Sequence, residues 1–176
     1  MNLVLVIGFA GLFALTHVAN AWLFHSFEIS AHVGLVYMPA FLRLFNVLVL
    51  GPIKGSLATF LGGALLLLHF NDEPLLGALN IVCSLSGPLL ALGFFRSYVQ
   101  RPVNLGSLHD LMLLAVVSCV FNTLLHHAVW IWIDPAQVET PWQWLWMGLG
   151  DFAGCLIGVG LMKWAIDRFG LPPKAG

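Results

Sequence analysis

The chain has 176 residues, of which 60% are hydrophobic and only 9% are charged, and its mean hydropathy is +0.93. A soluble globular protein of this composition would expose too much apolar surface, so the composition excludes that class and indicates an integral membrane protein. The net charge of −1 excludes a nucleic-acid partner, which would require a concentrated basic patch. We expect one membrane domain over residues 1–176, with the lipid bilayer as its surroundings.

Six apolar runs are candidates for membrane-spanning helices, which need about 20 residues each. Turn residues separate most of these runs, as in the segment GPIKG at residues 51–55. The break at residues 25–32 has neither proline nor glycine, and we expect a short interfacial helix or an extension of a neighbouring span there. The predicted fold class is an all-α, polytopic transmembrane helix bundle of about six spans, with expected ranges 3–24, 33–51, 55–70, 75–96, 109–133 and 142–166.

Charged residues alternate between the two sides of this predicted bundle. Cytoplasmic loops of membrane proteins are enriched in Lys and Arg, and six of the seven basic residues fall in the second loop, the fourth loop and the C-terminal end: Lys54, Arg96, Arg101, Lys163, Arg168 and Lys174. The first, third and fifth loops carry only acids: Glu28, Asp72, Glu73, Asp134 and Glu139. We therefore expect a multi-pass protein of the bacterial inner membrane with both termini in the cytoplasm.

The seventh basic residue, Arg43, lies inside the second predicted span, and Asp151 lies inside the last. Both are roughly ten residues, or ~15 Å, inward from the outer ends of their spans. An isolated charge in hydrocarbon costs at least ~2.5 kcal/mol, so an opposite charge at the same depth favours pairing. We expect Arg43 and Asp151 to face each other. The alternative is that Arg43 extends to the interface while Asp151 caps a helix break after Gly148 and Gly150.

Two further features border the expected ion pair. Gly150, Gly154 and Gly158 recur every four residues and predict a stripe along which another helix backbone approaches closely. Asn46 follows Arg43 by one helical turn and is expected to add a hydrogen bond on the same face.

Histidines form a second constellation in the outer half of the predicted bundle. In FNTLLHHAVW, Asn122 and His126 stand four residues apart and so share a helix face, and His127 lies on the adjacent face. Imidazole binds transition metals and haem iron, so His126, His127 and His69 are candidate ligands. The alternative is that these histidines are tolerated at an interface, since no pair has the H-x-x-x-H spacing of a metal site. The sequence identifies no cofactor.

The segments MPAFLRLFNVLVLG, GSLATFLGG, GALN and WMGLGDFAG together resemble the first class of membrane-associated sensor (MASE) domains. That family has a Pro-Ala-Gly element in an early span and a Trp-x-Gly-Asp-x-x-Gly element late. Pro39 and Ala40 match the first element with Phe41 in place of Gly, and Trp146, Gly150, Asp151 and Gly154 match the second with one extra residue. The resemblance spans residues 33–166 and implies a sensory role. In size and number of helices the chain is also similar to the substrate-capturing subunits of energy-coupling-factor vitamin transporters.

Nothing in the sequence indicates an enzyme, because the serines lack the G-x-S-x-G context of a nucleophile. Cys83, Cys119 and Cys155 have no CxxC pair, and we expect them to be buried small hydrophobes. We expect no soluble domain after the last span, so any output passes through a membrane protein partner or a second copy of the chain. The leading hypothesis is a non-enzymatic sensory or ligand-binding module centred on Arg43, Asn46, Asn122, His126 and Asp151. The alternatives are an accessory subunit of a larger membrane complex and an outer-face metal- or haem-binding protein.

Overall fold

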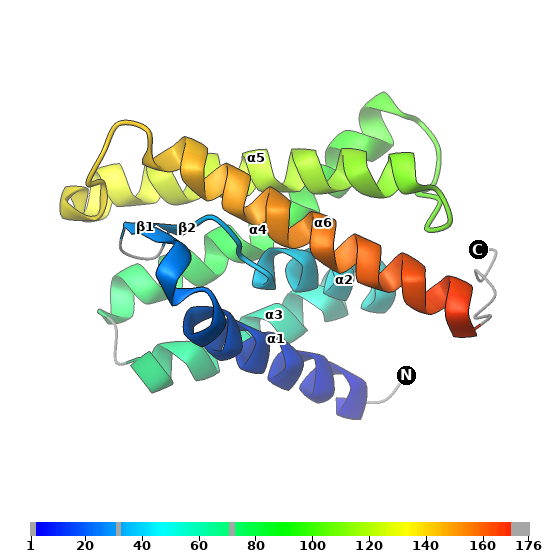
Figure 1. Cartoon of the computed structure of the whole chain (residues 1–176), viewed down its shortest axis with the longest axis horizontal. Helices are drawn as coiled ribbons and strands as arrows, with labels where there is room; N and C mark the ends of the chain where they lie inside the picture. The colour runs from blue at the N-terminus through cyan, green and yellow to red at the C-terminus, as the bar shows by residue number, and fades with distance from the viewer. Residues whose placement is uncertain (1–2, 31–32, 71–72, 170–176) are drawn as a thin grey trace.

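The computed structural model of the chain describes residues 3–30, 33–70 and 73–169. It is an all-α bundle with a small two-stranded hairpin at one end (Figure 1). The six α-helices are α1 (Leu3–Leu23), α2 (Pro39–Leu50), α3 (Pro52–Phe70), α4 (Pro74–Tyr98), α5 (Leu108–Ile133) and α6 (Gln143–Phe169). The 3-10 turns are η1 (His25–Phe27) and η2 (Pro135–Gln137), and the strands are β1 (Glu28–Ser30) and β2 (Val33–Gly34).

Five of the helices, all except α2, are long and apolar enough to cross a membrane. Their observed ranges agree with the predicted spans to within three residues at each end, which confirms the predicted polytopic bundle. Prolines at the first helical positions of α2, α3 and α4 explain where these helices begin, because proline lacks the N–H that the first turn leaves unpaired. Gly51 has a positive φ of 83° and allows the sharp reversal between α2 and α3.

The second span is not the continuous helix over residues 33–51 that the sequence predicted. Its helical part, α2, has 12 residues, and it is preceded by strand β2 and an extended segment. In the break at residues 25–32 we expected a short interfacial helix or an extension of a neighbouring span. The structure has the 3-10 turn η1 there, followed by β1, which pairs antiparallel with β2. Extended backbone is tolerated inside a membrane bundle only where its polar groups are satisfied. Here the Leu35 N–H donates to the Phe27 carbonyl at 3.0 Å, and the Tyr37 N–H donates to the Gly150 carbonyl of α6 at 3.0 Å.

The predicted glycine stripe on α6 accommodates this extended segment. A Cβ added at Gly150 would collide with the carbonyl oxygen of Gly34, and one added at Gly154 would collide with that of Tyr37. At Gly158 the neighbour is the ring of Phe41. A backbone does approach the stripe closely, as predicted, but at Gly150 and Gly154 it belongs to the extended segment before α2 and not to another helix. This segment of the chain fills the stripe and leaves no room there for a helix of a partner protein.

Helix α2 is the centre of the bundle, because it contacts each of the other five helices. Figure 1 shows it enclosed between α1 and α3 on one side and α5 and α6 on the other. The main apolar core lies between α2, α4, α5 and α6 and includes Leu44, Phe95 and Leu114. All three cysteines are buried thiols, as predicted. They are not all isolated, since the Sγ atoms of Cys119 and Cys155 lie 3.9 Å apart.

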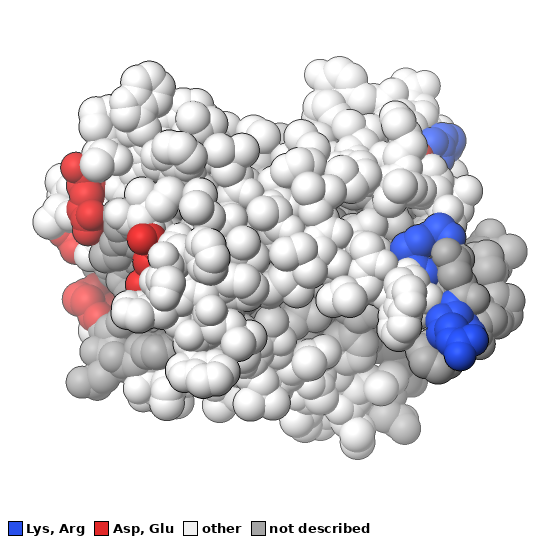
Figure 2. Space-filling model, in the orientation of Figure 1, with Lys and Arg blue, Asp and Glu red and all other residues white. Residues whose placement is uncertain are grey.

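The charges separate to the two ends of the bundle. Figure 2 shows acidic residues gathered at the end where the hairpin and the α5–α6 connection lie, and basic residues gathered at the opposite end. Helix α1 begins and α6 ends at the basic end (Figure 1). The structure thus has the charge separation on which the topology prediction rests.

Candidate functional site

A buried ion pair lies at the middle of the bundle. Nη2 of Arg43, from α2, donates to Oδ2 of Asp151, from α6, at 3.0 Å. The two residues are only 3% and 2% exposed. The predicted pairing of Arg43 with Asp151 is confirmed, and the alternative of an arginine that extends to the interface is wrong. Each charge removes much of the cost of burying the other.

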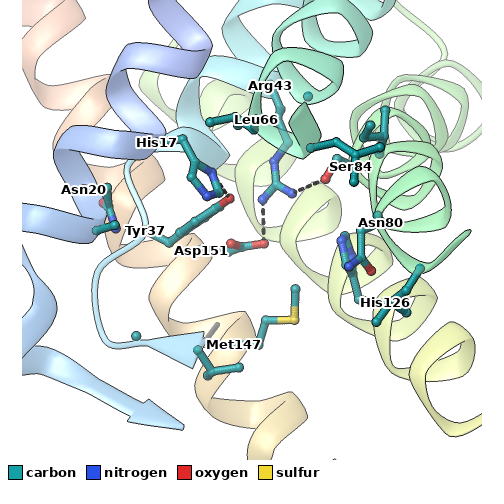
Figure 3. Close-up of a pocket in the computed structure, with 18 of the residues that line it drawn as sticks. His17, Asn20, Tyr37, Arg43, Leu66, Asn80, Ser84, His126, Met147 and Asp151 are labelled. Carbon is teal, nitrogen blue, oxygen red and sulfur yellow. Dashed lines mark hydrogen bonds and ion pairs between the residues drawn. The ribbon is translucent and has the colours of Figure 1, made fainter. Parts of the chain in front are cut away.

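The ion pair belongs to a network that joins four helices. Asn122 of α5 accepts a hydrogen bond from Arg43 Nη1 at 2.8 Å and donates one to Asp151 Oδ2 at 2.6 Å. Ser84 of α4 accepts a second bond from Arg43 Nη1 at 3.2 Å (Figure 3). Asn122 was predicted as part of the polar core, and it is the amide that bridges the two charges. A buried ion pair needs such additional hydrogen bonds to offset its desolvation.

Tyr37 connects this network to α1. Its ring faces the Arg43 guanidinium, with Cζ of Arg43 5.4 Å from the ring centroid, which is a cation–π geometry. The Tyr37 hydroxyl and Nδ1 of His17 lie 2.9 Å apart and share a hydrogen bond (Figure 3). Next to this contact, the side-chain oxygen of Asn20, also in α1, accepts a hydrogen bond from the Met38 N–H at 2.8 Å. The short segment before α2 is therefore held by side chains of α1 as well as by the backbone of α6.

A cavity of about 630 Å³ lies above the ion pair and extends to the acidic end of the bundle. This volume is in the range of small-molecule sites, which have apolar walls and a few convergent polar groups. The network forms its floor through Arg43, Ser84 and Asp151. Figure 3 shows the polar side chains that surround the space from α1, α4 and α5, namely His17, Asn20, Asn80 and His126. The Trp130 indole also lines it and donates to Oδ1 of Asn80 at 2.9 Å.

Carboxylates dominate the charge of the cavity. The described residues that line it include four acids and a single basic residue, Arg43, which Asp151 already neutralises. The other three acids, Glu28, Glu73 and Asp134, lie in elements at the acidic end. Glu28 contacts His25, Glu73 accepts from the Leu76 N–H, and Asp134 accepts from the Gln137 side-chain amide. Within the described parts of the chain, none of these three acids pairs with Lys or Arg. The mouth of the cavity therefore has a negative electrostatic potential.

Asn46 does not join the site. Its Nδ2 donates to Thr59 Oγ1 of α3 at 3.1 Å, and the side chain is fully buried. Three residues along a helix correspond to about 300° of rotation, so Asn46 is turned ~60° away from Arg43. Because α2 is surrounded by helices, that rotation brings Asn46 against α3. The expectation that Asn46 bonds to the ion pair is wrong.

The candidate metal ligands are not brought together. His126 is buried beside the cavity, and its Nδ1 donates to the Asn122 carbonyl at 2.9 Å. His127 makes the corresponding bond to the Thr123 carbonyl at 3.3 Å. His69 lies near the end of α3 and does not line the cavity. Over residues 3–30, 33–70 and 73–169 no group of three or more His, Cys, Asp or Glu has the arrangement of a metal site. His32, another outer histidine, lies outside the described residues.

Comparisons with protein-family models, with curated proteins and with solved structures found no match. The resemblance to membrane-associated sensor domains therefore stays a prediction. The site itself is defined by its geometry: a polar cavity in a membrane bundle, closed at its floor by a buried ion pair.

Sequence reasoning missed several residues of this site. Tyr37, Ser84, Asn80, Trp130 and His17 were not proposed as site residues. The sequence signal that could have identified two of them is their position within a span, because Asn80 and Ser84 are polar residues in the interior of an apolar helix. Polar groups inside a membrane segment usually face the bundle interior, so that rule would have selected both.

Proposed function

We propose that the protein is a non-enzymatic, ligand-binding module of the membrane that takes a small organic cation into the cavity from its acidic end. The observation that carries this proposal is the 630 Å³ cavity, lined by polar side chains and floored by the Arg43–Asp151 pair. A bundle that required only structural stability would fill such a space with apolar side chains, because voids forfeit packing energy.

The charge and shape of the cavity support a cationic ligand. Glu28, Glu73 and Asp134 attract cations to the mouth, and low-dielectric walls focus the field of such charges. The rings of Tyr37 and Trp130 offer faces that stabilise an organic cation by cation–π attraction. An anion would meet uncompensated carboxylates before it reached Arg43, whose charge is already engaged by Asp151.

Occupancy is proposed to act on the segment before α2. Tyr37 contacts His17 of α1, the Arg43 guanidinium and the backbone of α6, so a ligand that changes its position changes the packing of three helices. The ligand shifts the population between two packings in proportion to its preference for one of them. A membrane protein partner, or a second copy, senses that change on the outer surface of the bundle.

Orientation follows from the charge separation. The acidic end is proposed to face the periplasm and the basic end the cytoplasm of a bacterial cell, with both termini cytoplasmic, in agreement with the positive-inside rule. The cavity then samples small cations from outside the cell.

The test is a thermal-melt screen of the detergent-purified protein against small ammonium compounds, from trimethylammonium to 2-phenylethylammonium. Each compound is compared with a carboxylate of similar size. A ligand that binds the folded state raises the melting temperature, and we expect shifts from ammonium compounds and none from carboxylates. Equal shifts from both charge classes contradict the proposal.

A matched pair of variants tests whether the ligand binds in this cavity. Leu76 lines the cavity near its mouth, whereas Leu75 is exposed on the outside of α4. Leu76→Trp narrows the mouth and is expected to weaken ammonium binding at least about tenfold, which corresponds to ~1.4 kcal/mol. Leu75→Trp is expected to leave binding unchanged. A shift that survives Leu76→Trp rules out this cavity as the site.

A further inference from the structure

A second hollow lies at the opposite, basic end of the bundle. It has a volume of about 670 Å³ and is lined by the end of α2, the start of α3, the last turns of α4 and the connection that follows α4. Its walls combine apolar side chains such as Leu48, Leu92 and Val103 with two arginines, Arg96 and Arg101. We call this hollow the basic groove.

The two arginines of the basic groove differ in how their charges are balanced. Arg101 donates to both carboxylate oxygens of Asp110, at 2.5 Å and 2.6 Å, and these hydrogen bonds raise the pKa of Arg101 above its ordinary value. Asp110 therefore fixes the position of Arg101 and compensates its charge. Arg96 is exposed in the last turn of α4 and makes no hydrogen bond or ion pair with any described residue. The groove thus has one uncompensated positive charge on its wall.

The N-terminus of α3 adds to this positive potential. Gly51 and Pro52 line the groove where the 19-residue helix begins. The first N–H groups of a helix have no partner within it, and its N-terminal end carries a partial positive charge. A negatively charged oxygen in the groove would therefore meet Arg96 on one wall and the start of α3 on the other.

We propose that the basic groove binds the phosphate headgroup of an anionic phospholipid. The charges are complementary to phosphate, and the apolar walls formed by Leu48, Leu92 and Val103 suit acyl chains, which a free phosphate ion lacks. Basic pockets between helices at one membrane surface are suited to anionic headgroups. The site is separate from the ligand cavity, with which it shares no lining residue, and it does not depend on the proposed function.

The test is native mass spectrometry of the detergent-purified protein titrated with phosphatidylglycerol and, separately, with phosphatidylcholine. We expect one tightly bound phosphatidylglycerol per chain. We expect phosphatidylcholine to bind more weakly and without saturating at one molecule per chain. Each basic residue near an anionic lipid contributes enough to change affinity about fivefold, so Arg96→Gln is expected to weaken phosphatidylglycerol binding by about that factor. The control is Arg168→Gln. Arg168 is exposed, as Arg96 is, and lies at the same end of the bundle but outside the groove, so this variant loses the same charge and is expected to bind as the parent does.

Two outcomes overturn the proposal. If Arg96→Gln and Arg168→Gln lose affinity equally, the lipid responds to the general charge of this end and the groove is not a site. If glycerol 1-phosphate or inorganic phosphate displaces phosphatidylglycerol at similar concentrations, the acyl chains contribute nothing and the groove binds soluble phosphate. Melting curves of both variants should match that of the parent, because Arg96 holds no other described residue in place.

Discussion

Arg43 and Asp151 are 108 residues apart in the chain, yet Oδ2 of Asp151 accepts hydrogen bonds from both the Arg43 guanidinium and the Asn122 amide. One oxygen atom thereby connects α2, α5 and α6. This arrangement makes the stability of the bundle depend on three side chains as a unit.

The first prediction is a double-mutant cycle with Arg43→Ala, Asp151→Ala and the double variant. Each single change leaves the opposite charge buried without its partner, and we expect it to cost about 3–5 kcal/mol. The double variant is expected to cost clearly less than the sum of the two. The measurement is unfolding in mixed detergent, followed by circular dichroism. Additive losses would show that the pair contributes no coupling energy.

The second prediction distinguishes the two buried asparagines. Asn122→Leu is expected to be coupled to Asp151→Ala in a second cycle, with an interaction energy of about 0.5–3 kcal/mol, because the two side chains share a hydrogen bond. Asn46→Leu removes the bond to Thr59 and is expected to be additive with Asp151→Ala. Coupling of similar size in both cycles would contradict the separation of Asn46 from the site.

The third prediction concerns the α6 glycines. A Cβ at Gly154 would meet the backbone of Tyr37 and Met38, which cannot move without breaking the segment's bonds, so Gly154→Ala is expected to cost about 1–3 kcal/mol. Gly160 lies on the same helix and has nothing within 4 Å of an added Cβ. Gly160→Ala is expected to change the free energy of unfolding by less than about 0.5 kcal/mol. Equal effects at the two positions would exclude close packing along the stripe.

The fourth prediction tests orientation. Single cysteines at Glu139, at the acidic end, and Asn104, in the loop after α4, are introduced into a variant without Cys83, Cys119 and Cys155. Both sites are exposed. In intact cells an impermeant thiol reagent is expected to label the Glu139 position and leave the Asn104 position unlabelled until the membrane is opened. Labelling of Asn104 alone would reverse the proposed orientation, and equal labelling would contradict the bundle's topology.

The sequence predicted the long helices and the ion pair because both depend on strong, local signals. Apolar length defines a span, and a charge in hydrocarbon requires a partner at its own depth. The prediction of a continuous second helix was wrong because the first residues of that span are as apolar as those of a membrane helix. They stay extended because their backbone forms hydrogen bonds with Phe27 and Gly150. Gly150 is far away in the sequence, and Phe27 comes close to Leu35 only because β1 and β2 pair. The placement of Asn46 failed for a similar reason, since helix periodicity gives a direction but not the neighbour found there.

The position of Arg43 in the second span and Asp151 in the last has a consequence for biogenesis. During synthesis α2 enters the membrane long before α6 exists, and it is a 12-residue helix that carries an uncompensated guanidinium. Until Asp151 arrives, α2 has neither the length nor the charge balance of a stable span, so we expect it to depend on the reversal at Gly51 and on α3 to stay inserted. A nascent chain that lacks α6 would hold the Arg43 guanidinium without its counter-ion Asp151, and an uncompensated buried charge is strongly destabilising. Synthesis of α6 is therefore the step that we expect to stabilise α2 in the membrane.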